Sequence, residues 1–380
     1  MIRLVSYIVL GFANALAQTP APAAQPPQQE AGKSPRLTAL EISRLKTKAE
    51  SGDANSQAIL GKAYKEGNGV QQNDALALKW LRKAADQGDA SGENDLGIMY
   101  RMGEGVAQDK EEAVRWYHKA AKQRNARAMF NLGVSYYNGD GVSSDPNLAY
   151  AWFLLAQEAG NPAANDAVKR SAEEGENLGV TPDALQQAAA MYEKGDDLQQ
   201  SYAEAAKWYR KAADLGSPQA GVKLATMLIG GQGVQQDYGQ ALSLCKGAAK
   251  RNYATGDYCV GYIYLHGLGA TADPKEAAKW YDLASKGGNL KATMDLAEMY
   301  WKGQGVGVDR PESYYLFFLA RQRGVPDAKT RAQALRGEMN EEEIKHLEKK
   351  LRDLRFDPKK VFAYMQNQSV PDASSGSGPP

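Results

Sequence analysis

The amino-acid sequence predicts an all-α fold: an α/α superhelical solenoid of seven 36-residue helix-pair repeats, with an interrupting helix and a C-terminal capping helix. The prediction rests on three markers that recur every 36 residues, namely a Leu-Gly pair followed by a Tyr, a Gly-x-Gly turn and a Trp. Stacked repeats of this kind bury their apolar faces against one another. In the first three repeats the markers are Leu60, Leu96 and Leu132; Tyr64, Tyr100 and Tyr136; Gly67, Gly103 and Gly139; and Trp80, Trp116 and Trp152.

Seven repeats can be placed along the chain in two blocks, three before an insertion and four after it. The fourth and fifth repeats are degenerate, because Asp197 replaces the second Gly of the turn in the fourth and Leu244 replaces the Trp in the fifth. The repeats are expected at residues 53–88, 89–124, 125–160, 181–216, 217–252, 253–288 and 289–324.

Each repeat is expected to form two antiparallel helices, as the second repeat illustrates. Leu96 and Gly97 lie on one face of the first helix, which Gly103 ends because glycine readily adopts a positive φ. Asp109 is placed to cap the second helix, and Trp116 begins its apolar face at helical spacing. One such pair cannot bury its own apolar faces, so neighbouring pairs must stack into a superhelix with a concave side.

The second repeat resembles the Sel-1-like repeat, a relative of the tetratricopeptide repeat. That family implies an α/α superhelix that acts as an adaptor in protein assembly, without fixing the partner. The resemblance covers residues 53–324 apart from the insertion. The residues that carry it are Leu96, Gly97, Tyr100, Gly103, Gly105, Val106, Asp109, Ala113, Trp116, Tyr117, Ala120 and Ala121.

The segments outside the repeats have distinct compositions. The first 17 residues combine a positive charge at Arg3, an apolar stretch and a small-x-small site ending at Ala17, which indicates a signal peptide and a periplasmic or secreted protein. The Pro-, Ala- and Gln-rich residues that follow are typical of a flexible linker. The expected division is 1–17 signal peptide, 18–35 linker, 36–160 leading helix and repeats 1–3, 161–180 inserted helix, 181–324 repeats 4–7, 325–366 capping helices and 367–380 disordered tail.

Composition argues against several classes of function. Lys and Arg number 46 against 45 Asp and Glu, so there is no basic stripe for nucleic acid. The three histidines are far apart in sequence, and we expect no metal site and no cofactor. The recurring Gly-x-Gly-Val is not followed by the Lys-Ser/Thr of a phosphate loop, which favours a turn between helices. The mature chain is expected to have no transmembrane segment, and a monomer is compatible with the pattern.

The relationship to the tetratricopeptide fold implies which side chains face the concave groove. Aromatic and apolar residues at those positions are not required by the stacking of repeats, and exposed clusters of them favour partner binding. The alternative is that they pack against neighbouring repeats. The predicted partner-binding residues are Phe130, Tyr137, Tyr258, Tyr262, His266, Met294 and Trp301, with the principal site in the sixth and seventh repeats.

Two cysteines, Cys245 and Cys259, lie in consecutive helices, each seven residues from a turn expected near Asn252. Antiparallel helices would place them level, so they can form a disulfide in an oxidising compartment. The alternative is that both are small buried core residues. We predict that the two cysteines are linked or close enough to link.

The leading functional hypothesis is an exported adaptor that binds a protein or peptide and is not an enzyme. The alternative is a cell-wall-linked or penicillin-interacting enzyme, because Ser43-Arg44-Leu45-Lys46 matches Ser-x-x-Lys. Cysteine-rich proteins with the same repeat are linked to β-lactam binding or hydrolysis, but their regular cysteine pairs are missing from this chain. A third hypothesis is a structural spacer without a selective ligand.

Overall fold

A computed structural model describes residues 36–173, 181–269 and 271–366, and the regular elements in these ranges are all α-helices. The expected signal peptide, the linker and the C-terminal tail lie outside the described residues. The chain divides into two compact units, Met1–Trp208 and Tyr209–Pro380, here called the N-terminal and C-terminal units. The first and second helices of a repeat are called its A and B helices.

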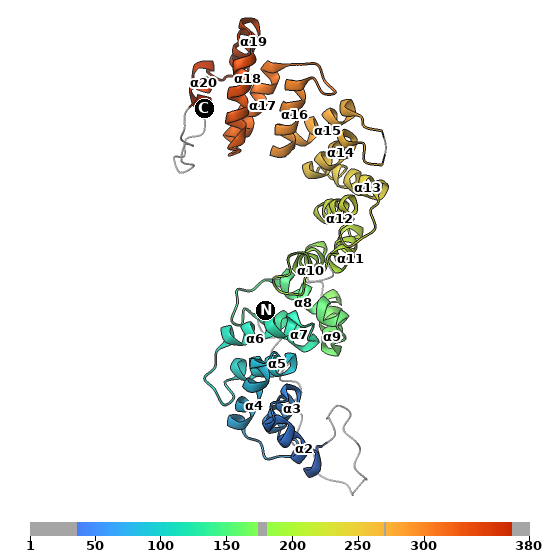
Figure 1. Cartoon of the computed structure of the whole chain (residues 1–380), viewed down its shortest axis with the longest axis vertical. Coiled ribbons are helices and arrows are strands. Elements are labelled where there is room, and N and C mark those ends of the chain that lie inside the picture. Colours follow the sequence, from blue (N-terminus) through green and yellow to red (C-terminus); the bar gives the residue numbers. More distant parts are fainter. Residues whose placement is uncertain (1–35, 174–180, 270, 367–380) are drawn as a thin grey trace. The chain divides into compact units, whose positions relative to one another are not determined.

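In the N-terminal unit the helices follow one another as stacked pairs (Figure 1), and the helices from α2 to α9 each pack on the next in sequence. The leading helix expected after Pro35 is present. The helices are α2 (Ala39–Glu50), α3 (Ala54–Glu66), α4 (Asp74–Asp86), α5 (Ala90–Met102), α6 (Lys110–Lys122), α7 (Ala126–Asn138), α8 (Pro146–Glu158), α9 (Pro162–Glu173) and α10 (Pro182–Lys194).

The C-terminal unit repeats this pattern and ends in three further helices (Figure 1). Helix α11 (Tyr202–Asp214) contains the boundary between the units. The helices after it are α12 (Pro218–Gly230), α13 (Tyr238–Ala249), α14 (Ala254–His266), α15 (Pro274–Lys286), α16 (Leu290–Lys302), α17 (Arg310–Gln322), α18 (Asp327–Glu338), α19 (Glu341–Asp353) and α20 (Pro358–Gln366).

Short polar residues and glycines set the helix ends, as the sequence predicts. Asp89 and Asp109 cap α5 and α6, each accepting a hydrogen bond from a backbone N–H in the first turn. Gly103 ends α5 with φ of 75°, a conformation that costs other residues energy. A glycine with positive φ ends each of the other A helices in the same way.

Two glycines of each regular repeat also allow close approach between helices. A Cβ on Gly97 of α5 would lie 2.7 Å from the Tyr117 ring of α6, so this glycine seats the A helix on the B helix of its own repeat. A Cβ on Gly141 would lie 2.2 Å from the Lys110 carbonyl oxygen at the start of α6. The second turn glycine is therefore a contact between repeats as well as a turn residue.

The adjacent Trp and Tyr of the B helix differ in burial. Tyr117 and Tyr281 are fully buried, whereas Trp116 and Trp280 are half-buried at the edge of the core. Trp152 is itself fully buried. The repeated Trp therefore belongs to the packing face, but its depth differs between repeats because neighbouring side chains differ.

The insertion begins in phase with the preceding repeats. Helix α9 starts 36 residues after α7, and the Asn161 side chain donates to the Ala126 carbonyl as Asn125 donates to that of Ala90, both at 3.1 Å. Helix α10 starts 36 residues after α8 and packs on it, but ends at Gly195 with the left-handed cap of an A helix. Helix α10 thus has the position of a B helix of the first block and the C-cap of an A helix.

The C-terminal helices close the apolar face of the last repeat. Phe317 and Phe318 of α17 are buried in one cluster with residues of α18, α19 and α20. A capping box at Asn340 begins α19. Sequence analysis did not single out α20, although Val361 and Met365 repeat at helical spacing and are both buried.

Candidate functional site

The predicted partner-binding residues all lie on A helices. The surface that these residues form along the A helices is here called the A-helix face. His266 is exposed and the other six are half-buried. A half-buried aromatic side chain can pack within the fold and also bind a partner. Its contacts with neighbouring residues determine how much of the ring stays accessible to a partner.

In the third repeat the aromatic residues pack partly within the fold. The Phe130 ring lies 5.4 Å from the ring of Phe153 in α8, and both belong to a cluster that includes Ala167 of α9. Tyr137 is at the edge of the same cluster. Helix α9 therefore contacts part of the surface that an open A-helix face would leave free.

In the sixth repeat Tyr258 is held by two contacts. Its ring stacks on Tyr281 at 5.2 Å, and its hydroxyl donates to Asp295 of α16 over 3.0 Å. Burial raises the pKa of Asp295, and the bond from Tyr258 partly offsets that effect. Further along α14, the rings of Tyr262 and His266 lie 4.3 Å apart and leave the His266 side chain exposed.

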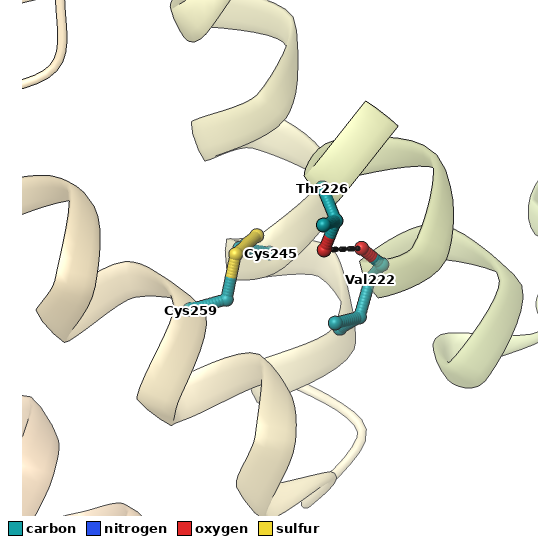
Figure 2. Close-up of a disulfide and its surroundings, with 4 residues drawn as sticks. All are labelled: Val222, Thr226, Cys245 and Cys259. Atoms are coloured by element: carbon teal, nitrogen blue, oxygen red, sulfur yellow. Dashed lines mark hydrogen bonds between the residues drawn. A yellow bond between two sulfur atoms is a disulfide. The ribbon is translucent and has the colours of Figure 1, made fainter. Parts of the chain in front are cut away.

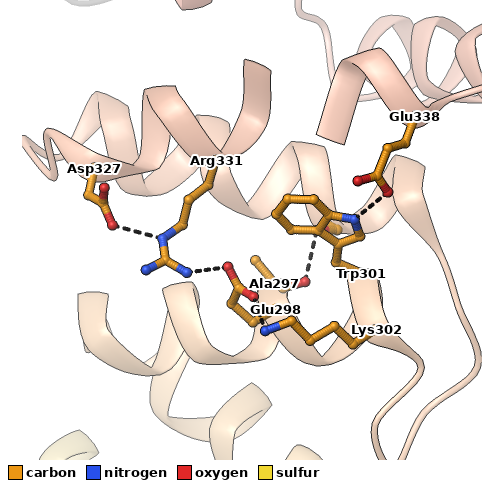
Figure 3. Close-up of polar contacts among 8 residues, drawn as sticks. Ala297, Glu298, Trp301, Lys302, Asp327, Arg331 and Glu338 are labelled. Atoms are coloured by element: carbon orange, nitrogen blue, oxygen red, sulfur yellow. Dashed lines mark hydrogen bonds and ion pairs between the residues drawn. The ribbon is translucent and has the colours of Figure 1, made fainter. Parts of the chain in front are cut away.

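In the seventh repeat the groove positions contact α18 (Figure 3). Trp301 donates from Nε1 to Glu338 over 2.8 Å and meets the Phe317 ring edge-on at 6.3 Å. Met294 lines a cavity of about 360 Å³ between α16 and α18. Trp301 is therefore already in contact with the capping helices.

Two cations near the seventh repeat, Lys302 of α16 and Arg331 of α18, pair with one carboxylate. Arg331 binds both Glu298 and Asp327, and Lys302 lies 2.8 Å from Glu298 (Figure 3). Burial acts to raise the pKa of Glu298, but the bonds from Lys302 and Arg331 outweigh it, so the pKa is lowered. The carboxylate is held ionised between two cations.

The two cysteines are bonded in the structure (Figure 2). The disulfide joins α13 to α14, with 5.7 Å between the Cα atoms of Cys245 and Cys259. Both side chains are buried. Asn252, with φ of 58°, lies in the turn between the helices. The link is therefore part of the hairpin core, away from the solvent.

A large cavity lies in the N-terminal unit, where sequence analysis did not place the principal site. It measures about 960 Å³ and is bordered by α3, α5 and α7. Phe130, one of the predicted partner-binding residues, lines it together with Asn94 and Ile98. A smaller cavity of about 180 Å³ shares Asn94 with it and extends it along α3 and α5.

The cavity is also lined by charged residues that sequence analysis did not single out. Arg36, Lys62, Lys65 and Arg127 line it. Lys62 lies one repeat before Ile98, and Lys65 lies two repeats before Tyr137, at the same repeat positions. Arg36 precedes α2 and Arg127 lies in the first turn of α7, so no single repeat position marks all four cations. Only the stacking of the helices brings these side chains to one place.

Ser43 and Lys46, the residues of the alternative enzyme site, are not hydrogen-bonded to each other among the described residues. The Lys46 ammonium lies 5.9 Å from the ring centre of Tyr64. Within the same ranges no group of three or more His, Cys, Asp and Glu side chains is arranged to hold a metal ion. In the described part of the chain, no helix has the length and apolar character needed to cross a membrane.

Comparison with known proteins matches the Sel1 repeat family model seven times, at residues 54–89, 90–125, 126–161, 182–217, 218–253, 256–289 and 290–325. Protein sel-1 homolog 2 of Homo sapiens is 31% identical over 103 residues, which cover 27% of this chain and 15% of that protein. Alginate biosynthesis protein AlgK of Azotobacter vinelandii is 27% identical over 126 residues, 32% of this chain and 27% of its own length. The chain thus matches a minor part of each relative. A protective antigen of uropathogenic Escherichia coli with an SLR fold is 32% identical, with a TM-score of 0.42, covering 85% of this chain and 71% of that one.

Proposed function

Because the chain belongs to the Sel1 repeat family, we propose that it is an exported adaptor or scaffold whose A-helix face binds a protein or peptide partner. It is proposed to act by binding and not by catalysis. Repeat solenoids present extended concave surfaces, and that architecture suits a partner that lies along several repeats.

The observation that carries the proposal is the cavity of about 960 Å³ on α3, α5 and α7. Most of its lining residues belong to these three A helices. Ligand sites are typically concave and combine apolar surface with a few polar groups. Ile98 and Phe130 provide the apolar part and Asn94 a polar group.

The aromatic positions of the later repeats are a second part of the proposed surface. Tyr262 and His266 support it best, because their ring pair leaves His266 exposed. Tyr258, Met294 and Trp301 complete the set, although each of them also has contacts within the fold. Tyr137 extends the surface in the third repeat.

Capture from envelope extract by the mature chain, with mass spectrometry, tests this function. Phe130→Ala and Tyr262→Ala should each lower recovery of a specific partner, since truncation of a binding anchor typically costs about 2 kcal/mol or more. Tyr202→Ala is the matched control, because Tyr202 is exposed on a B helix. Equal recovery by all variants, with helicity unchanged, would reject the A-helix face as the binding surface.

Export is supported by the N-terminal sequence pattern alone. Fractionation and N-terminal sequencing of the native protein should find the chain outside the cytoplasm, beginning at Gln18. Native protein that retains Met1 and stays in the cytoplasm would contradict export without touching the binding proposal.

The penicillin-interacting alternative has a direct assay. The mature chain should turn over neither nitrocefin nor muropeptides, and Ser43→Ala should behave as wild type. Turnover that Ser43→Ala abolishes would establish the enzyme instead.

A further inference from the structure

The cavity on α3, α5 and α7 has an excess of positive charge. Four basic side chains and two acidic ones, Glu66 and Asp95, line it, although the whole chain has a net charge of only +1. Field lines concentrate in concave sites, so an excess of two charges attracts anions more strongly there than on a flat surface.

Two of these cations have no ionic partner within the described part of the chain. Arg36 and Arg127 are exposed, and no described carboxylate lies within 4.0 Å of either guanidinium. The two lysines are weakly paired, with Lys62 3.8 Å from Glu66 and Lys65 4.0 Å from Glu104. Both lysines are half-buried, but ion pairs at such long distances contribute little and leave the lysines available to another carboxylate.

The position of Arg36 is fixed by the fold. The backbone N–H of the next residue, Leu37, donates to the Asn68 side chain over 2.9 Å, which ties the start of α2 to the turn after α3. Arg127 lies in the first turn of α7. The two guanidinium groups therefore come from different elements that border one cavity.

A row of amides crosses the same cavity. Asn131 donates from Nδ2 to Asn94 Oδ1 over 2.9 Å, and Asn94 donates to Asp95 Oδ1 over 2.9 Å. Asn94 and Asp95 are buried. These bonds orient the side chains, and an asparagine has more donors and acceptors than the row uses. The amide of Asn131 can therefore bond to a peptide backbone of any sequence.

We propose that this cavity binds an extended segment of a partner protein that is rich in Asp and Glu. The backbone of the segment bonds to the asparagine row, and its carboxylates pair with Arg36 and Arg127. Arginine is suited to this role because its planar guanidinium can bind a carboxylate through two hydrogen bonds. The proposal rests on the adaptor function and specifies the chemistry of the partner at this one surface.

Fluorescence anisotropy with the full mature chain tests the proposal. The probes are a short labelled peptide of alternating Glu and Ser and the same peptide with Gln in place of Glu. The Glu peptide should bind more tightly, with an affinity that falls as salt is added because exposed charges are screened. The double variant Arg36→Gln/Arg127→Gln should weaken it about tenfold or more, since a hydrogen bond to a charged group contributes roughly 1.5–3 kcal/mol.

Two controls keep the result specific. Arg323→Gln removes an exposed arginine that does not line the cavity and should leave binding unchanged. Asn131→Ala should weaken the Glu and Gln peptides by a similar factor, because it acts on the backbone. Circular dichroism should show the same helicity for every variant.

Three results would overturn the proposal. The Gln peptide could bind as tightly as the Glu peptide, or the double arginine variant could bind as wild type. A peptide of residues 18–34 could displace the Glu peptide and bind more tightly, which would assign the cavity to this chain's own segment. If the capture experiment still recovers a partner through the A-helix face, these results reject the acidic ligand and leave the adaptor function intact.

Discussion

The A-helix face carries basic side chains in both units, but it uses them differently. In the N-terminal unit Arg36, which precedes α2, and Arg127 of the third repeat border an open cavity without described ionic partners. In the C-terminal unit Lys302 of the seventh repeat and Arg331 of α18 converge on Glu298. The same architecture thus gives a charged surface that can receive a partner and a neutralised surface that closes the fold.

The helices at the ends of the repeat array explain the difference. Trp301 bonds to Glu338, 37 residues later, just as Tyr258 bonds to Asp295 and Asn131 to Asn94 at the same separation. Helix α18 therefore makes the contacts that the A helix of a next repeat would make. At the other end of the array, α2 precedes the first repeat and leaves the cavity open. A groove position becomes a cap contact when a further helix packs over it.

The largest effect expected is from the core beneath the cap. Phe317→Ala should destabilise the C-terminal unit by about 3–5 kcal/mol, because it removes a fully buried aromatic ring. Trp301→Ala should cost less, since that ring is half-buried. Urea unfolding followed by circular dichroism measures both changes. A loss from Trp301→Ala as large as that from Phe317→Ala would mean that the groove residue is itself core.

Reduction of the disulfide should destabilise the C-terminal unit and leave the stability of the N-terminal unit unchanged. The chain's two cysteines are bonded within the C-terminal unit. In the chain-entropy model, a closed loop of this length contributes about 3 kcal/mol. Dithiothreitol, or the Cys245→Ala/Cys259→Ala variant, should lower the unfolding midpoint of that unit only. Hydrogen exchange resolved by peptide measures this, and equal loss of protection in α5 and α6 would contradict it.

The close approach between repeats should matter equally in both units. Gly141→Ala and Gly305→Ala each place a Cβ 2.2 Å from a backbone carbonyl oxygen. Overpacking of this kind typically costs about 1–3 kcal/mol. Gly88→Ala and Gly288→Ala are matched controls, since both have positive φ but nothing within 4 Å. If the contact and control variants lose equal stability in thermal unfolding, the cost comes from backbone strain alone and the close approach does not contribute.

The smallest effect expected is pH-dependent and confined to the C-terminal unit. Because the folded-state pKa of Glu298 is lowered, its ion pairs stabilise the fold above the usual pKa near 4.5, and this contribution is lost as the pH falls through the lower value. Glu298→Gln should cost about 1 kcal/mol at neutral pH, and the difference from wild type should shrink in acid. The pKa of Asp295 is raised by burial, so its effect on the pH dependence of stability has the opposite sign. The relevant measurement is therefore the difference in stability between wild type and Glu298→Gln at each pH. A difference that is constant from pH 7 to pH 3 would contradict this assignment.

The sequence was sufficient for the repeats because each marker acts locally or at a fixed period. Gly103 ends a helix and Asp109 begins one through contacts within a turn, whatever lies further away. Sequence analysis did not mark α20 as a separate helix within the expected capping region 325–366, because its apolar face is short. It also could not show that α10 combines the place of a B helix with the C-cap of an A helix, because that requires knowing which helix packs on α8.

The candidate surface divides in the same way. Phe130 and Trp301 could be placed on the A-helix face by register alone. Whether they stay available depended on α9 and α18, whose packing no single repeat encodes. The sequence by itself determined a Sel1 repeat solenoid, because its period, caps and glycines fix each helix pair. Only the tertiary structure decided which basic side chains border an open cavity. Arg36 precedes α2, Lys62 lies in the first repeat and Arg127 in the third, and the stacking of α3, α5 and α7 makes them neighbours.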